Sequence, residues 1–311
     1  MLCFENWINK SIKMVCFHKS LVYNISRVKE KYFENMELVA QLLPQVSAQI
    51  RAAMGNIQLS LDLLQEKDPE HADSNLIRNI SLLNQSYYRL LRLSKNLSAA
   101  ELLSEKESFT TEDVELVALI SALTDPVEAL AAEKGLEFSF TCDQPYVLTA
   151  VNVEQFRFLL YNLLSNALKF TPAGGKVQLE LKGGKGSDPI LLSVSDTGCG
   201  IRADEMEILF DRFSHAESRP APHGLGLGLP LCRAIARRHG GTLVVNSAAG
   251  KGTTVTASLQ RVKPQNVTIF DVRKNYEAKG RLFFSADGYN CVLTQLADAL
   301  PYKSFDPRYL E

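Results

Sequence analysis

Two stretches of heptad-like hydrophobic spacing most constrain how this chain can fold. Apolar side chains recur at steps of three and four over residues 39–64, and the same rhythm returns over residues 76–97. Such steps place side chains on one face of an α-helix. The polar segment between them, QEKDPEHADS, contains Pro69 and offers Asp73 or Ser74 as the N-cap of a second helix. The pattern predicts an antiparallel hairpin of two long helices.

A lone hairpin of this kind leaves one apolar face in contact with water. A second copy that packs on this face completes a four-helix bundle. We therefore expect a homodimer or heterodimer formed through the hairpin. The hairpin is assigned to residues 31–104, after an N-terminal extension of unknown role at residues 1–30.

Residues 105–260 differ from the helical hairpin in their sequence pattern, because helical and strand-like segments are mixed in them. Helices are expected at residues 114–134, 153–170 and 228–239, and strands near residues 136–141, 177–181, 190–195, 242–246 and 253–259. Since the order does not alternate strictly, we expect an α+β fold with helices on one face of a mixed sheet. Residues 261–311 are treated as a C-terminal tail, in which no motif is recognised.

The composition excludes several classes of protein. With 311 residues and 46% hydrophobic residues, the chain is long and apolar enough for two modest domains. Lys and Arg total 34 against 35 Asp and Glu, so no charge excess points to nucleic acid. No apolar run reaches the roughly 18 residues that a membrane span needs. The six cysteines contain no CxxC pair, which favours free thiols in the cytoplasm over disulfides or a zinc site.

The segment YNLLSNALKFTP, residues 161–172, carries a polar stripe on its expected helix. Asn162, Asn166 and Lys169 are spaced four and three residues apart and project from one face. This stripe suits a magnesium–phosphate group, because a hard cation takes oxygen ligands and lysine neutralises phosphate. The same spacing is equally compatible with an ordinary amphipathic helix.

In the segment VSDTGCGI, residues 194–201, an expected strand ends at Asp196 and runs into Gly198 and Gly200. A carboxylate at this position can accept a hydrogen bond from an exocyclic amine such as that of adenine. Taken alone, the segment is more often a simple Asp-Thr-Gly turn.

Two further segments follow in the chain. LFDRF, residues 209–213, places two phenylalanines around Asp211 and Arg212, and alone it says little. In HGLGLGLPL, residues 223–231, glycines alternate with leucines and enter an expected helix. Such a loop lets backbone N–H groups and a helix N-terminus approach phosphates, although a lone glycine-rich loop is weak evidence.

Together and in this order, the four segments resemble the asparagine, glycine and phenylalanine boxes of the sensor histidine kinases. Their ATP-binding fold is shared with gyrase and several chaperones. The resemblance covers residues 105–260, and the preceding hairpin is similar to the family's dimerisation domain. It implies an α/β-sandwich domain that binds ATP and Mg²⁺, with Asn166 as the Mg²⁺ ligand. The implied ATP-binding residues are Asn162, Asn166, Lys169, Asp196, Gly198, Gly200, Arg212, Gly224, Leu225, Gly226, Gly228 and Thr253.

The same resemblance assigns residues 214–223 to a lid over the phosphates, anchored by Phe210 and Phe213. In this lid His215 stands where many family members carry arginine. Related ATPases place a glutamate at the position of Asn162 to activate water. Because an amide cannot act as that base, the site is expected to hold ATP for transfer rather than for hydrolysis.

The expected phosphoacceptor helix departs from the family's pattern. Members carry a motif like His-Glu-Leu-Arg-x-Pro-Leu, and the matching stretch here is AQIRAAM, which begins at Ala48. Alanine has no nucleophile, and Gln49 cannot serve as the neighbouring base. Autophosphorylation within this chain is therefore not expected. The chain's histidines are interpreted as surface or structural residues: His18, His71, His215, His223 and His239.

Two functions remain open at this point. The first is a histidine-kinase-type phosphotransferase whose acceptor lies on another chain, such as a heterodimer partner or a phosphotransfer protein that serves a response regulator. The second is a catalytically degenerate kinase that binds ATP and acts as an interaction module for a partner kinase or a response regulator. Plain ATPase activity is disfavoured by Asn162.

Overall fold

The computed structural model describes residues 72–99, 109–184, 186, 188–207, 227–263 and 290–306, together with Ile50, Ala53, Asn56 and Ile57. The chain divides into two compact units, residues 1–47 and 48–311, and every described residue lies in the second. Ala48, most of the first expected hairpin helix and the expected lid lie outside the described residues. Among the helices that are described, none is long and apolar enough to cross a membrane.

Five strands form the main sheet, in the order β2-β4-β5-β7-β6. They are β2 (Glu137–Cys142), β4 (Lys176–Lys182), β5 (Ile190–Asp196), β6 (Leu243–Ser247) and β7 (Thr253–Leu259). β2 pairs with β4 in parallel, and the other neighbours are antiparallel. Buried and more exposed residues alternate along β4 and β5, which is the pattern of a sheet with one covered face.

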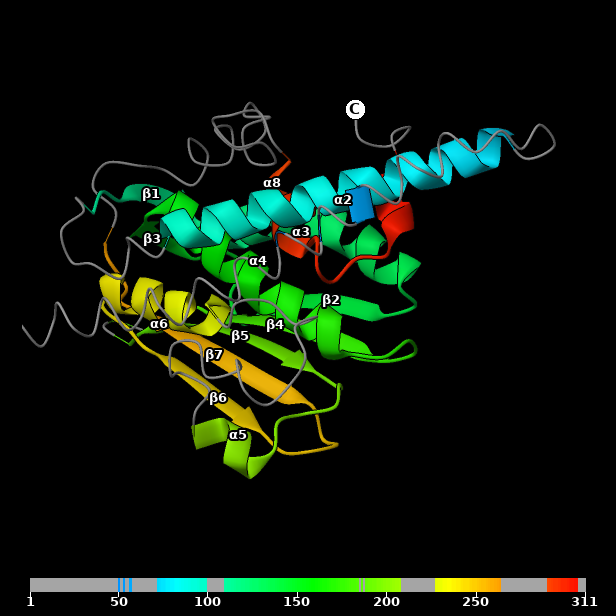
Figure 1. Cartoon of the computed structure of the whole chain (residues 1–311). Coiled ribbons are helices and arrows are strands. Elements are labelled where there is room, and N and C mark those ends of the chain that lie inside the picture. Colours follow the sequence, from blue (N-terminus) through cyan, green and yellow to red (C-terminus); the bar gives the residue numbers. More distant parts are fainter. Residues whose placement is uncertain are drawn as a thin grey trace, which may run out of the picture. The chain divides into compact units, whose positions relative to one another are not determined.

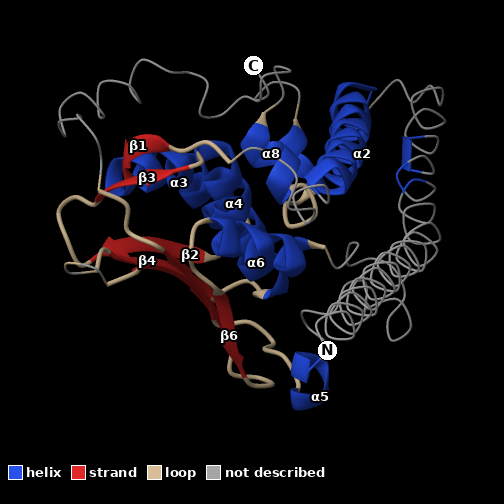
Figure 2. Cartoon of the chain, turned by 90° about the vertical axis from the view of Figure 1, so that its left-hand side faces the viewer, coloured by secondary structure: helices blue, strands red, loops and turns tan. Residues whose placement is uncertain are grey.

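Three helices cover that face of the sheet (Figure 2). They are α3 (Leu116–Glu133), α4 (Val153–Phe170) and α6 (Gly228–Arg238). Their leucines and isoleucines form one hydrophobic cluster with the inward residues of the strands. A short helix, α5 (Ala203–Glu207), follows β5. The α+β class and the sandwich of helices on a mixed sheet are confirmed.

A small second sheet precedes α3. It consists of β1 (Glu112–Glu115) and β3 (Leu148–Val151), which pair antiparallel. The buried carboxylate of Glu115 accepts hydrogen bonds from Val117 N and Val147 N, each at 2.9 Å. Through these bonds Glu115 caps the start of α3 directly after β1. The helix expected from residue 114 therefore begins two residues later.

α2 (Ala72–Ala99) is the second helix that the heptad spacing predicted. It begins before Asp73, so the two expected N-cap residues lie inside its first turn rather than ahead of it. On its apolar face Leu76 is 45% exposed and Tyr87 is 43% exposed. An open apolar face is what the dimeric bundle requires, and the bundle itself stays a prediction.

Residues 290–306 form α8 (Cys291–Leu296) and the 3-10 helix η4 (Tyr302–Phe305) beside α2 (Figure 1). Their apolar side chains belong to the same hydrophobic cluster as those of α3 and α4. This part of the segment 261–311 is therefore core structure, for which the sequence had offered no motif. The expected domain boundaries remain predictions.

Candidate functional site

The polar stripe of α4 forms as its spacing predicted. The helix begins at the N-cap Asn152, whose side chain accepts a hydrogen bond from Gln155 N at 3.0 Å. Asn162 is only 1% exposed, and its Nδ2 donates to Phe158 O at 2.9 Å. This bond directs the amide oxygen of Asn162 away from its own helix. Asn166, one turn later, is partly exposed.

The amide oxygen of Asn162 meets the first residue of α6. A Cβ atom placed on Gly228 would lie 3.3 Å from Asn162 Oδ1, so a larger residue there would require a small shift of the Asn162 side chain. Leu227, the N-cap of α6, makes no side-chain capping bond. Leu227 therefore leaves the first N–H groups of α6 without a cap from its own side chain, and a helix end of this kind can bind an anion. The structure thus places Asn162 next to Gly228, two residues of the expected set, and their role in nucleotide binding stays a prediction.

The carboxylate of Asp196 stands at the end of β5. Its Oδ1 accepts hydrogen bonds from Gly198 N at 2.8 Å and from Thr253 N at 3.2 Å. Burial raises the pKa of this carboxyl, and the two N–H bonds act in the opposite direction. Among the described residues both bonds end on Oδ1, which leaves Oδ2 for the amino group of a ligand. Two loops therefore hold Asp196 in a fixed orientation.

Glycines let those two loops pass close to each other. A Cβ on Gly198 would collide with the backbone oxygen of Phe170 at the end of α4. A Cβ on Gly252 would collide with the backbone oxygen of Asp196 itself. The loop between β6 and β7 is further joined to the site by Ser247, whose Oγ accepts from Ile201 N at 2.9 Å.

Gly252 and Ser247 are site residues that sequence reasoning missed. The available signal was the run GKGTT, in which a second glycine directly precedes β7 beside Thr253. Thr253 itself was expected in the site, and its backbone N–H reaches Asp196.

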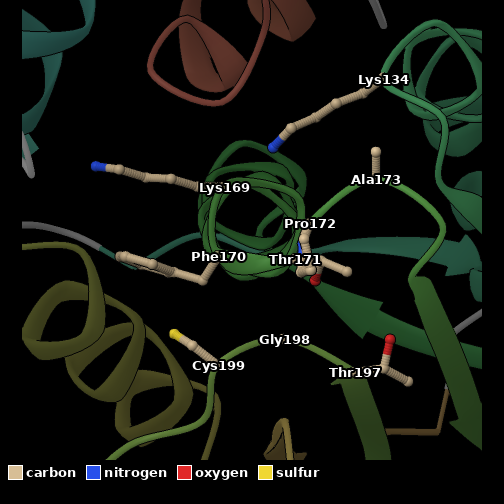
Figure 3. Close-up of a pocket in the computed structure, with 9 residues that line it drawn as sticks. All are labelled: Lys134, Lys169, Phe170, Thr171, Pro172, Ala173, Thr197, Gly198 and Cys199. Atoms are coloured by element: carbon tan, nitrogen blue, oxygen red, sulfur yellow. The ribbon is translucent and has the colours of Figure 1, made fainter. Parts of the chain in front are cut away.

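A groove of about 590 Å³ opens beside these residues. Lys169, Phe170 and Cys199 line one side of it, and Lys134 and Thr197 line the other (Figure 3). This volume lies within the range of small-molecule sites, roughly 300 to 1,000 Å³. The groove includes Lys169 and Gly198 from the expected set but not Asn162 or Asn166, so it marks only one end of the expected nucleotide site.

The two lysines of the groove play different parts. Lys134 Nζ donates to Leu168 O and so satisfies a carbonyl in the last turn of α4. Lys169 lies over the ring of Phe170, 5.4 Å from its centroid. Burial lowers the pKa of Lys169, while the carboxylate of Asp298 raises it. The expected contact of Lys169 with phosphate stays a prediction.

The remaining expected residues lie outside the described part of the chain. These are Arg212, Gly224, Leu225 and Gly226, together with Phe210, Phe213 and His215 of the expected lid region. Their assignment to the site stays a prediction.

His239 was expected to be a structural or surface residue, and its contacts agree with a structural role. Its Nε2 accepts from Asn152 N at 3.1 Å, while its Nδ1 lies 2.8 Å from Ile235 O. This pattern fits a neutral ring with its proton on Nδ1. Burial lowers the pKa of His239 accordingly.

Comparison with known proteins matches residues 152–263 to the family "Histidine kinase-, DNA gyrase B-, and HSP90-like ATPase". Sensor histidine kinase WalK of Bacillus subtilis is 27% identical over 243 residues, which cover 77% of this chain and 39% of WalK. Hybrid signal transduction histidine kinase D of Dictyostelium discoideum is 32% identical over 238 residues, 74% of this chain and 15% of that protein. The chain thus spans less than half the length of either relative.

Two solved structures share the fold. Histidine kinase ThkA, in complex with the response regulator protein TrrA, matches with a TM-score of 0.55 at 19% identity, over 75% of this chain and 65% of ThkA. ShkA in complex with AMPPNP matches with a TM-score of 0.50 at 22% identity, over 72% of this chain and 47% of ShkA.

Proposed function

We propose, on the premise that this chain carries the ATP-binding domain of the sensor histidine kinases, that it binds Mg-ATP and donates the γ-phosphoryl group to a histidine of a partner chain. The observation that carries the proposal is that expected site residues stand on three elements, α4, α6 and β5. The Asn162 amide of α4 lies beside Gly228 at the start of α6, and the Asp196 carboxylate is held at the end of β5 by Gly198 N and Thr253 N.

The residues fit a magnesium nucleotide on structural grounds. Asp196 offers Oδ2 to an adenine amine, and Gly198 keeps the space beside it free of a side chain. Lys169 and the start of α6 supply positive charge and N–H donors for phosphate. Asn166 offers an amide oxygen to Mg²⁺, which would neutralise charge on the phosphates. We assign the adenine end to Asp196 and the phosphate end to Asn162, Asn166 and Lys169.

The identity of Asn162 favours transfer over hydrolysis. Its Nδ2 is engaged by Phe158 O, and an amide oxygen has no proton affinity suited to a general base. The site therefore lacks a water-activating carboxylate at this position. A bound ATP would be kept intact until an external nucleophile arrives.

The acceptor is proposed to lie on another chain, because Ala48 and Gln49 offer neither nucleophile nor base. The partner is a related kinase chain joined through the helical hairpin, or a separate phosphotransfer protein. ThkA is in complex with a response regulator, and we extend that class of partner to this chain. We place this activity in the cytoplasm.

The second candidate is an interaction module that binds ATP without transferring phosphate, and the alanine at position 48 favours it. Purified native chain and its Ala48→His variant are incubated with γ-labelled Mg-ATP. Label on the variant alone supports a working transferase that lacks its own acceptor. No label on either chain supports the interaction module. Label on the native chain contradicts the assignment of Ala48.

A further inference from the structure

Strand β6 forms one edge of the main sheet and is paired on one side only. Its neighbour there is β7, and no further strand of the described residues lies beyond it. Figure 1 shows β6 at the outer border of the sheet, on the side of β7 away from β5. An edge strand of this kind carries a row of backbone N–H and C=O groups that another strand can bind.

The hydrogen bonds with β7 show which backbone groups of β6 face outward. Ser258 N donates to Thr242 O at 2.8 Å, so the backbone groups of Thr242 face β7. Because these groups alternate along an antiparallel strand, those of Val244 also face β7, while those of Leu243 and Val245 face away from it. Among the described residues, the outward groups of Leu243 and Val245 have no backbone partner.

This edge also lacks the features with which proteins block such strands. Residues 241–247, GTLVVNS, contain no charged residue and no proline, and the pairing with β7 runs without a bulge over the whole strand. Val244 is 57% exposed, more than any other large hydrophobic side chain of the described residues. The opposite edge, β2, carries the charged Glu137, which pairs with Lys176 at 2.7 Å. Of the two edges, β6 is therefore the one suited to pairing with a further strand.

The residues of β6 match a second copy of the same strand. In an antiparallel pair with a two-fold axis at Val244, the two Val244 side chains meet on the outer face of the sheet. Leu243 then lies opposite Val245 of the second copy, and Thr242 lies opposite Asn246. Apolar residues thus meet apolar ones and polar residues meet polar ones, and no like charges are brought together.

A two-fold axis at Val245 gives a poorer match. It would place Val244 opposite Asn246 and Leu243 opposite Ser247, so apolar side chains would face polar ones. With the axis at Val244, the outward backbone groups of Leu243 lie opposite those of Val245, and such a pair exchanges both of its N–H···O=C bonds. The register centred on Val244 therefore suits the side chains and the backbone together.

We propose that β6 is an interface between two copies of this chain, in which the two strands pair antiparallel about Val244 and the two five-stranded sheets become continuous. This interface is separate from the bundle expected of the helical hairpin, because β6 belongs to the ATP-binding domain. It is also independent of the proposed phosphoryl transfer. Since the paired segment is short, we expect the contact to form at high protein concentration.

Disulfide trapping in the full chain tests this register. The two Val244 positions would form a non-hydrogen-bonded pair with Cα atoms about 4.5 Å apart, which is within the range of a disulfide. Mild oxidation of Val244→Cys is therefore expected to link two chains through the introduced thiols, and mass spectrometry of a digest identifies that bond. The native chain, oxidised in parallel, shows the linkage that its own cysteines produce.

Asn246→Cys is the matched control, because it places a thiol on the same exposed face of β6. Asn246 would lie opposite Thr242 of the second copy, so the two introduced thiols would be displaced by about 13 Å along the strands, too far for a disulfide. We expect only the native background from this variant. Equal linkage in Val244→Cys and Asn246→Cys would show random collision and overturn the interface. Absence of the bond in Val244→Cys would overturn it as well.

Hydrogen–deuterium exchange at high protein concentration provides a second test that introduces no thiol. Val244→Lys would place two like charges opposite each other and separate the strands. The amides of Leu243 and Val245 are then expected to exchange up to about tenfold faster than in the native chain, through loss of a backbone hydrogen bond. Val262→Lys changes an exposed valine outside β6 and is expected to match the native chain. Equal exchange of these amides in all three proteins would contradict the interface.

Discussion

Two glycines in the loop between β6 and β7 allow the geometry of the adenine end to be tested with an internal control. Gly250 has a φ of 73° and Gly252 a φ of 77°, so alanine meets the same backbone strain at both positions. Alanine at such an angle costs about 1 to 2 kcal/mol. A Cβ on Gly250 meets nothing within 4 Å, whereas a Cβ on Gly252 collides with the backbone oxygen of Asp196.

The difference between the two alanine variants therefore isolates the collision. An enforced shift of packed backbone costs about 1 to 3 kcal/mol more, so Gly252→Ala should lower the free energy of unfolding by that much beyond Gly250→Ala. The displaced strand end also carries the Asp196 carboxylate, which Thr253 N holds at 3.2 Å. Loss of one charge-assisted hydrogen bond to adenine, about 1.5 kcal/mol, weakens Mg-ATP binding about tenfold.

Urea denaturation gives the free energies of unfolding, and isothermal titration calorimetry gives the Mg-ATP affinities of both variants. We expect native-like affinity in Gly250→Ala and about tenfold weaker binding in Gly252→Ala. Equal destabilisation of the two variants would refute the collision. Native affinity in Gly252→Ala would refute the role of Asp196 in nucleotide binding.

Three further predictions concern separate parts of the molecule. Asn166→Ala should weaken ATP binding about tenfold in the presence of Mg²⁺ and leave Mg²⁺-free binding unchanged, as titrations with and without EDTA would show. Phe305→Ala should lower the free energy of unfolding by about 3 to 5 kcal/mol, because the ring is fully buried beside Tyr88; a smaller loss in urea denaturation would argue against a place for residues 290–306 in the core. His239 stays neutral in the folded state because burial lowers its pKa, so the unfolded chain takes up the proton first as the pH falls below about 6.5. Stability should fall with pH in that window, and His239→Gln should flatten the decline in thermal melts recorded from pH 7 to pH 5.

The regular elements of the ATP-binding domain were predictable from local pattern. Strand β7 spans Thr253–Leu259 and α4 spans Val153–Phe170, which are the ranges that the sequence pattern indicated. Both signals are confined to neighbouring residues, so a sequence displays them directly. The polar stripe on α4 follows from the same local geometry.

The elements that were missed depend on contacts between distant residues. β1 and β3 have four residues each and are defined by their pairing with each other. The helix α8 has six residues, too few for a periodic signal, and the hydrogen bond from Gln85 to Leu300, which follows α8, spans 215 positions. Gly252 shows its importance only once its closeness to the Asp196 backbone is known.

Binding of Mg-ATP to the full chain is the most direct test of the central claim that α4, α6 and the loops beside Asp196 form a nucleotide site. Calorimetry should register one binding event per chain. A concentration of about 100 times the dissociation constant should stabilise the folded state by about 2.7 kcal/mol. Titrations without heat, accompanied by unchanged melting in excess Mg-ATP, would contradict the site and the transfer function together.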